Sequence, residues 1–223
     1  MRYFPFLAIL ALAACQSEQK APAHIYVDYY VRYLQTEQQL KAHAAFYEGD
    51  TLETARSLTF ENGVKFQGYK MLPRQVEEDR TMRYVFNGTG TYDSTFLFQY
   101  TDNKGQEQEY KISMAPIRDF SIVGEASRDK GFSLKIDGEP FQANESLILL
   151  FTSEKNQSAM AEFKGPFDVE ELKVPPVQLM RVQEGKNFLY LVKKQVNSSQ
   201  SGNLDITSSA EFYTKVIELQ VVK

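Results

Sequence analysis

The chain has 223 residues, 43% of them hydrophobic, and a formal net charge of −4. This length suits one large domain or two of about 100 residues each, and an acidic chain without a Lys/Arg-rich patch is not a typical nucleic-acid binder. The single cysteine excludes a disulfide within the chain, so the folded part must depend on packed apolar cores.

The first fifteen residues have the composition of a removable export signal. Arg2 is followed by a mostly apolar run that ends at Ala14, and the only cysteine, Cys15, comes next. The run at residues 6–14 is too short for a permanent membrane-spanning helix, which needs about 20 residues. A basic start, a short apolar core and small residues before the cut are typical of a cleaved signal. We therefore expect residues 1–14 to be a signal peptide.

The motif Leu12-Ala13-Ala14-Cys15 resembles the lipobox of bacterial lipoproteins. The resemblance implies cleavage between Ala14 and Cys15 by signal peptidase II, and acyl chains attached to Cys15. Two or more acyl chains form a durable membrane anchor, whereas one is marginal. Gln16 stands where the family's inner-membrane retention signal has Asp, which implies the outer membrane, facing either the periplasm or the exterior. Apart from this covalent lipid, no cofactor is expected.

The segment after the lipobox begins with a polar stretch and continues into an ambiguous one. Residues 15–24 contain Pro22 and no periodicity, which indicates a tether. In residues 25–47, apolar side chains recur at helical spacing in the first part, but Tyr and Val are dense and the second part alternates with period two. We predict two strands there, with an N-terminal helix at 26–47 as the alternative.

Short alternating segments predict β-strands through the rest of the chain. Turn-forming pairs such as Asn87-Gly88 and Asp137-Gly138 separate them, and residues 102–105 predict a hairpin loop. The expected strands are residues 64–69, 82–86, 96–100, 109–114, 132–136, 146–152, 159–163, 169–174, 187–192 and 211–221, with a polar loop at 197–201.

Strands at intervals of about ten residues are typical of β-sandwiches. Pro116, which follows a predicted strand, marks a boundary between halves that each have the size of an immunoglobulin-like domain. We predict an all-β protein of two tandem immunoglobulin-like β-sandwich domains, at residues 25–117 and 118–223. The likeness is one of pattern only, because the chain lacks Trp and the paired cysteines. A single lipocalin-like β-barrel is the alternative.

The sequence lacks the motifs of common enzymes. His24 and His43 are the only histidines, and there is no HExxH, CxxC, Gly-x-Ser-x-Gly or phosphate-binding glycine loop. The oxygen-rich turn at residues 102–107 lacks the acidic spacing of a calcium loop. We therefore predict no catalytic residues and no metal site, and we expect the protein not to be an enzyme.

Tyrosine is concentrated in the first half of the chain. Ten tyrosines lie between Gln16 and Arg118, and only Tyr190 and Tyr213 follow. Tyrosine is enriched in binding surfaces, although it also packs strands and covers sheet edges. If the protein has a recognition surface, we expect it at the cluster of Tyr26, Tyr29, Tyr30 and Tyr33.

These observations predict a non-catalytic cell-envelope lipoprotein that acts as a protein-interaction or assembly and adhesion module, anchored by acyl chains on Cys15. Its expected partners are the membrane, through the anchor, and an envelope protein; nucleic acid is not expected. The alternatives are a carbohydrate-binding surface lipoprotein, with tyrosines stacking on sugar rings, and a β-barrel carrier of a small hydrophobic ligand.

Overall fold

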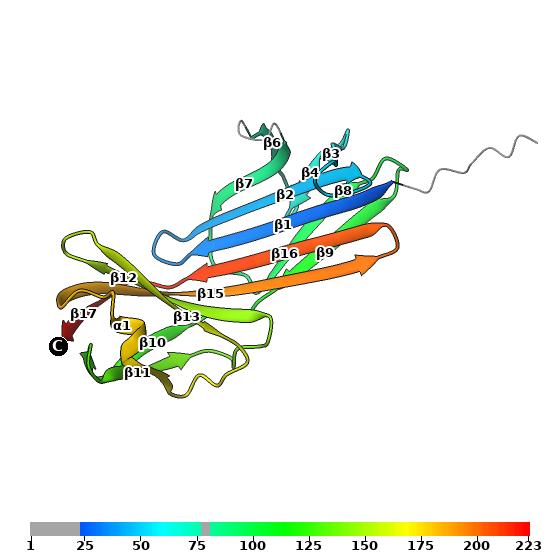
Figure 1. Ribbon diagram of the computed structural model, residues 1–223. Coiled ribbons are helices and arrows are strands. Elements are labelled where there is room, and N and C mark those ends of the chain that lie inside the picture. The colour runs from blue at the N-terminus through cyan, green and yellow to red at the C-terminus, as the bar shows by residue number, and fades with distance from the viewer. Residues whose placement is uncertain (1–22, 77–80) are drawn as a thin grey trace, which may run out of the picture.

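The computed structural model describes residues 23–76 and 81–223, and its strands form two groups (Figure 1). In these residues the only helix has four residues, and strands make up most of the rest. No helix in the described part is long and apolar enough to cross a membrane. The prediction of an all-β protein is confirmed.

The upper group of strands in Figure 1, which we call the upper lobe, consists of two facing sheets. One contains β6, β7, β2, β1, β16 and the second half of β15, in that order, and the other contains β5, β4, β8 and β9. Its strands from the first half of the chain are β1 (His24–Leu34), β2 (Gln39–Gly49), β3 (Arg56–Ser57), β4 (Val64–Phe66), β5 (Tyr69–Lys70), β6 (Leu72–Gln75), β7 (Met82–Thr89), β8 (Thr95–Thr101) and β9 (Glu107–Ser113).

The lower group, which we call the lower lobe, places β14, β11 and β10 next to β17, the first half of β15, β12 and β13. The short helix begins with a proline, which is favoured in the first helical turn. The elements of the second half are β10 (Asp119–Ser127), β11 (Gly131–Asp137), β12 (Glu145–Ser153), β13 (Ser158–Lys164), β14 (Leu172–Val174), α1 (Pro176–Leu179), β15 (Gly185–Ser201), β16 (Leu204–Tyr213) and β17 (Ile217–Val222).

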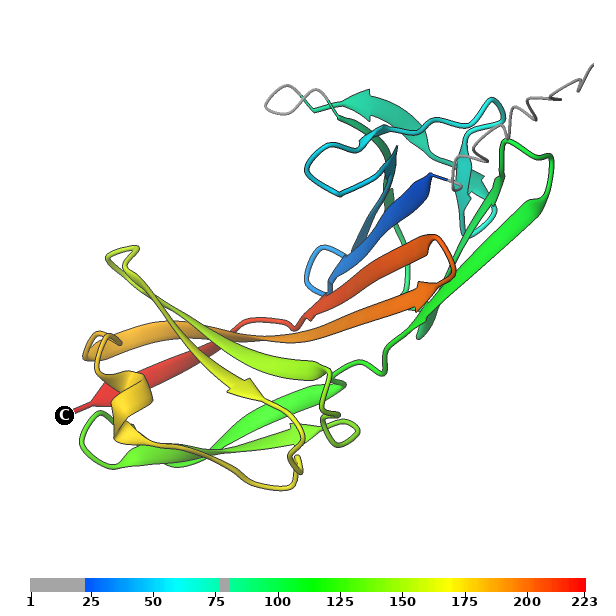
Figure 2. The same cartoon turned by 45° about the vertical axis from the view of Figure 1, so that its right-hand side comes forward.

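One strand, β15, belongs to both lobes. It has 17 residues, a length of about 55 Å at the usual rise per residue. Its first part pairs with β17 and its last part pairs with β16, which in turn runs parallel to β1. The C-terminal half of the chain therefore completes the sheet of the upper lobe (Figure 2). The division into domains at residues 117/118 stays a prediction, although residues 114–118 do connect β9 to β10.

The core of the upper lobe is aromatic. The Tyr29 ring stacks on Tyr110 at 4.6 Å between centroids and contacts Phe46 and Phe98. Phe46 in turn packs edge-on against Phe60 at 4.8 Å. Such pairs stabilise a fold by about 0.5–1.5 kcal/mol beyond the burial of their area. Part of the tyrosine concentration in the first half of the chain lies in this core, which contains or contacts Tyr29, Tyr33, Tyr84, Tyr92, Tyr100 and Tyr110.

A buried ion pair lies on β15 where the strand passes from one lobe to the other. The Lys193 ammonium is 3.1 Å from the Glu145 carboxylate, and both side chains are almost completely buried. Glu145 also accepts a hydrogen bond from the Gln142 N–H at 2.9 Å, and the ammonium lies 4.8 Å from the centre of the Phe141 ring. The pair is therefore held by other contacts as well as by charge.

Several sequence predictions need correction. The alternative of a helix at 26–47 is wrong, because residues 24–34 and 39–49 form the antiparallel pair β1–β2. The alternative of a single barrel is also wrong, because the described strands form two sheets and no closed barrel. Asn87-Gly88 does not end a strand but lies inside β7, paired with β2.

Two further predictions fail near the C-terminus. Residues 197–201, predicted as a polar loop, continue β15 and pair with β16. The single strand predicted at 211–221 is two strands, because residues 214–216 leave the sheet and the chain passes from one lobe to the other there. In both cases the tertiary pairing overrides the local polarity.

Candidate functional site

The structure divides the four predicted tyrosines between the two faces of β1. Tyr29 and Tyr33 point into the core and are 1% and 4% exposed, respectively. Tyr26 and Tyr30 lie on the opposite face, which β1 shares with β2 and β16 and which is only partly buried. Successive side chains of a strand alternate between faces, so the four cannot form one surface. Tyr29 and Tyr33 are core residues, and this part of the prediction is wrong.

The outer face of the large sheet carries an organised group of side chains, which we call the Glu211 cluster. It comprises Tyr30 and Arg32 from β1, His43 from β2, and Glu211 and Tyr213 from β16. Figure 1 shows no other element in front of β1, β2 and β16. The side chains of the cluster are partly buried, with 37% of the Arg32 side chain and 14% of the Glu211 side chain exposed, and the aromatic core lies on the other face of the sheet.

A single carboxylate oxygen holds the cluster together. Oε2 of Glu211 accepts hydrogen bonds from the Tyr30 hydroxyl at 2.7 Å and the Tyr213 hydroxyl at 3.1 Å. It also accepts one from Nε of Arg32 at 3.0 Å and lies 2.8 Å from Nη2 of that guanidinium. None of the hydrogen bonds that Glu211 accepts from the described residues ends on Oε1. Oε1 therefore keeps its acceptor capacity, on a side chain of which 14% is exposed.

Ring contacts fix the rest of the cluster. The Tyr30 ring stacks on His43 at 4.8 Å, and the Arg32 guanidinium lies 5.3 Å from the Tyr30 centroid and 5.1 Å from that of Tyr213. His43 contacts Asp28 at 3.3 Å. Because each side chain is held by at least one neighbour, little side-chain entropy remains to be lost on binding.

The network shifts the pKa values of its members. Burial acts to raise the pKa of Glu211, but hydrogen bonds from Tyr30 and Arg32 and the charge of Arg32 outweigh it, so the pKa is lowered. Burial, together with the nearby Glu211 charge, raises the pKa of Tyr213 to about 12 and also raises that of Tyr30. At neutral pH the cluster is therefore an ionised carboxylate surrounded by a guanidinium and two neutral phenols.

Two lysines flank the cluster along one row of the sheet. Lys41 is the register partner of Arg32 on β2, and Lys194 is the partner of Glu211 on β15. The row Lys41–Arg32–Glu211–Lys194 therefore crosses four strands with three cations and one anion. This is a locally basic surface on a chain whose net charge is negative.

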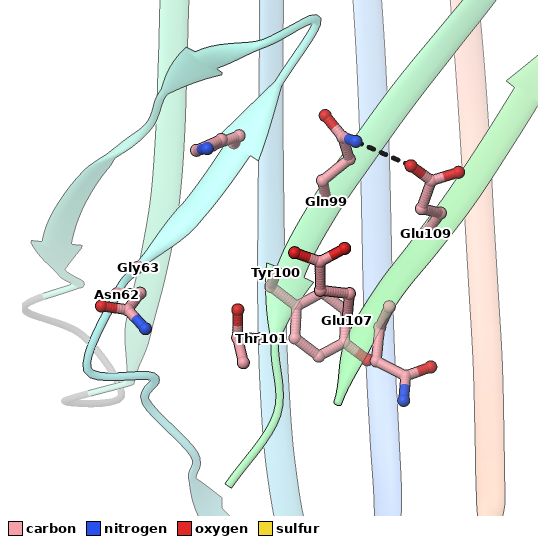
Figure 3. Close-up of a pocket in the computed structure, with 9 residues that line it drawn as sticks. Asn62, Gly63, Gln99, Tyr100, Thr101, Glu107 and Glu109 are labelled. Atoms are coloured by element: carbon pink, nitrogen blue, oxygen red, sulfur yellow. Dashed lines mark hydrogen bonds between the residues drawn. The ribbon is translucent and has the colours of Figure 1, made fainter. Parts of the chain in front are cut away.

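A second candidate lies in the smaller sheet, in a pocket of about 440 Å³ (Figure 3). Its walls carry mainly amide and carboxylate side chains from β8 and β9 and the chain leading into β4. Gln99 donates to Glu109 at 2.7 Å, as the dashed line in Figure 3 marks. The Tyr100 ring points to the other face of β8, where it packs on Phe60 at 4.5 Å and on Phe46 at 4.8 Å. The lining residues are Asn62, Gly63, Lys65, Gln99, Tyr100, Thr101, Glu107, Gln108 and Glu109.

Other polar groups that drew attention in the sequence have local roles. His24 contacts Asp205 at 2.9 Å, beside the start of β1. The Asp102 carboxylate accepts hydrogen bonds from the backbone N–H groups of Lys104 and Gln106 and from the Gln108 amide, so it closes the β8–β9 turn. The described residues contain no group of three or more His, Cys, Asp or Glu side chains arranged to hold a metal. The predicted lipidation site, Cys15, and the cleavage position at Ala14 lie outside the described residues.

Sequence reasoning missed Arg32, Glu211 and Tyr213. Glu211 lies 179 residues from Arg32, and the two meet only because β16 is parallel to β1. The only local signal in the sequence is that Glu211 is an acidic residue between Ala210 and Phe212 in a predicted strand. This signal does not show that Arg32 is its partner. No protein-family model and no curated protein matches the chain.

Proposed function

We propose that the protein is a non-catalytic cell-envelope lipoprotein, held at the outer membrane by acyl chains on Cys15, that binds another envelope protein. The observation that supports a binding role is the Glu211 cluster, an uncovered, rigid surface of tyrosines and charges. Tyrosine and arginine are enriched in protein interfaces and in their energetic centres. The flanking Lys41 and Lys194 favour a partner that presents acidic groups.

The position of the chain's entry into the fold supports a tethered arrangement. Asn203, in the β15–β16 turn, donates a hydrogen bond to the Ala23 carbonyl at 2.7 Å. The chain therefore enters at the end of the upper lobe that is farther from the lower lobe (Figure 1). An anchor attached before this point leaves the face with the Glu211 cluster and the lower lobe accessible to other envelope components.

Anchoring is tested by replacing Cys15 with Ser in the full-length chain. We expect loss of acyl labelling and release from the membrane fraction. A Cys15→Ser protein that is processed and still sediments with membranes would contradict the anchor.

Binding is tested with a photo-crosslinking amino acid placed at Val196, which is 41% exposed on the outer face. The matched control position is Lys111, an exposed residue of β9 in the smaller sheet. We expect a discrete crosslinked product from position 196 only, and its loss when Tyr30 and Arg32 are changed to Ala. Equal crosslinking from both positions would show that the outer face is not the binding surface.

Carbohydrate binding is the second candidate, and the pocket of Figure 3 is the observation that favours it. The amide and carboxylate side chains of this pocket offer sugar hydroxyls both donors and acceptors. Saturation-transfer NMR with neutral oligosaccharides tests this, with Gln99→Ala as the pocket variant and Ser209→Ala, on the other sheet, as control. Transfer that is unchanged by Gln99→Ala would contradict a sugar site here.

We also propose that the lower lobe is an immunoglobulin-like sandwich. Three strands, β14, β11 and β10, adjoin four, β17, β15, β12 and β13, which is the strand number of a constant-type immunoglobulin domain. The Phe132 and Phe151 rings, from β11 and β12, lie 6.5 Å apart. Nuclear Overhauser contacts between these rings test the facing of the two layers.

A further inference from the structure

Two parallel strands of the lower lobe separate along their length. β10 and β17 pair only through Ala126 and Ser127 with Val221 and Val222. On its other edge β10 pairs with β11, and that register shifts between Val123 and Ser127, where Gly124 takes a positive φ of 80°. A groove of about 500 Å³ opens between the diverging strands.

Free backbone groups line the β17 side of this groove. The Val222 carbonyl accepts a hydrogen bond from the Arg128 N–H at 2.9 Å, so the peptide groups of Val222 face β10. Backbone direction alternates along a strand, so Gln220 and Glu218 present their N–H and C=O groups to the same side. The parallel pairing of Ala126 with Val221 occupies the Gln220 carbonyl. Among the described residues, no strand pairs with the N–H of Gln220 or with the N–H and C=O of Glu218 on this side. They form a short edge with the hydrogen-bonding pattern of an unpaired strand.

The groove also has an apolar lining. Phe120 and Ile122 contribute from β10, and Ile217 and Leu219 contribute from β17. Phe120 and Leu219 are each 7% exposed, so they belong to the core and reach its edge here. A strand added to β17 would place alternate side chains against this lining.

One end of the groove carries an unpaired positive charge. Through Phe120 and Ile217 the groove continues into a crevice of about 290 Å³ that Arg118, Asp119 and Lys215 also line. The Asp119 carboxylate accepts a hydrogen bond from the Phe120 N–H at 2.9 Å. Arg118 is held by Asp137 at 2.6 Å, whereas the Lys215 ammonium has no acidic partner among the described residues. Charge complementarity at this end calls for an acidic group on the occupant.

The opposite wall restricts the kind of occupant. β10 lies across the groove from β17. The edge strand of a second folded copy would bring the rest of its sheet into collision with β10. A single extended segment carries no such sheet and can enter the groove. We propose that the groove between β10 and β17 binds an extended peptide segment of a partner protein by strand addition to β17. The segment has apolar side chains at alternate positions and an acidic residue facing Lys215. This site is separate from the Glu211 cluster and does not depend on the function proposed above.

Residue-resolved hydrogen exchange on the mature chain with Cys15→Ser tests the proposal. The probe is a blocked octapeptide of alternating valine and threonine, with glutamate at either its first or its last position. In the free protein, the amides of Glu218 and Gln220 should exchange fast, and those of Leu219 and Val221, which face β15, should exchange slowly. Saturation with the peptide should slow exchange at Glu218 and Gln220. If these amides are already protected in the free protein, or if neither peptide protects them, the proposal fails.

A charge reversal tests the predicted contact with Lys215, which is exposed, so we expect its replacement to leave the fold intact. Lys215→Glu should weaken binding of the glutamate peptide about fivefold, the effect of one surface ion pair, and should strengthen binding of a peptide with lysine at that position. Lys111→Glu, on the smaller sheet, is the matched control. Equal effects of the two variants would overturn the assigned acidic contact, and unchanged affinity of a peptide N-methylated at alternate residues would overturn strand addition.

Discussion

Glu211 is the residue on which the outer-face cluster depends. Its Oε2 atom accepts hydrogen bonds from Tyr30, Arg32 and Tyr213, and hydrogen bonds to a charged group stabilise a fold by about 1.5–3 kcal/mol. Glu211→Gln keeps the shape but removes the charge. We expect it to lower the free energy of unfolding by about 1–3 kcal/mol, measured by urea denaturation at pH 7.

The same residue predicts how stability depends on pH. The pKa of Glu211 is lowered in the folded state, so its contribution is complete above the ordinary glutamate pKa of about 4.3 and is lost as pH falls through the folded value. Tyr213 has its pKa raised to about 12, so its contribution is complete below about 10 and is lost as pH rises toward 12. Glu211→Gln should flatten the acidic side of the stability profile relative to wild type. An unchanged acidic side would show that the network contributes nothing to stability.

The tyrosines show what a local pattern predicts at the residue scale. The sequence correctly predicts a strand at β1, but it assigns one surface to side chains that lie on both faces of that strand. The pair Tyr29 and Tyr33 has the same four-residue spacing as the pair Tyr26 and Tyr30. Only Tyr29 and Tyr33 are buried, because their face of β1 is the one that packs in the core. Which face of a strand meets a second layer depends on distant segments, and the sequence near the strand does not contain that information.

At the scale of the elements, β15 contains a buried charge, that of Lys193, which is paired with Glu145. Lys193→Met would leave the Glu145 carboxylate buried without its counter-charge, and breaking one side of a buried pair costs about 3–5 kcal/mol. The double variant Lys193→Met with Glu145→Gln keeps an acceptor for the Gln142 N–H and buries no charge. Thermal and urea unfolding should therefore show the double variant to be more stable than Lys193→Met alone. A double variant that is less stable than Lys193→Met would show that the unpaired Glu145 carboxylate does not carry this cost.

Element prediction succeeded where the pairing is local. The β8–β9 hairpin follows from two alternating segments around a Gly-containing turn, and β11 and β13 were likewise predicted within a few residues. It failed for β15, whose second part reads as a polar loop because Asn197 to Ser201 have no apolar face. That segment is a strand because β16 pairs with it along its full length. The local sequence pattern does not reveal this pairing.

At the scale of the whole molecule, β15 joins the two lobes, because it pairs with β17 in the lower lobe and with β16 in the upper lobe. The chain leaves the upper lobe at residues 114–118, builds the lower lobe, and returns through β15 to place β16 beside β1. Ten register pairs join β1 to β16, and ten more join β16 to β15. A fragment that ends at residue 117 would keep β2 beside β1 but lack β16 on the other edge of β1, and this exposed edge would be free to aggregate.

This connection predicts the behaviour of a nicked chain. A protease site inserted between Ala115 and Pro116, in the connection between β9 and β10, should be cut without separating the two pieces, because β16 remains paired with β1. Size-exclusion chromatography under native conditions should give one peak that contains both fragments, and the fragments should unfold in a single transition. As a control, a second cut at Gly202 in the β15–β16 turn is combined with the first. β16 is then linked covalently only to β17, and the association of the N-terminal fragment with the rest of the protein should weaken. Two separated, folded fragments after the first cut would show that the lobes are independent domains after all.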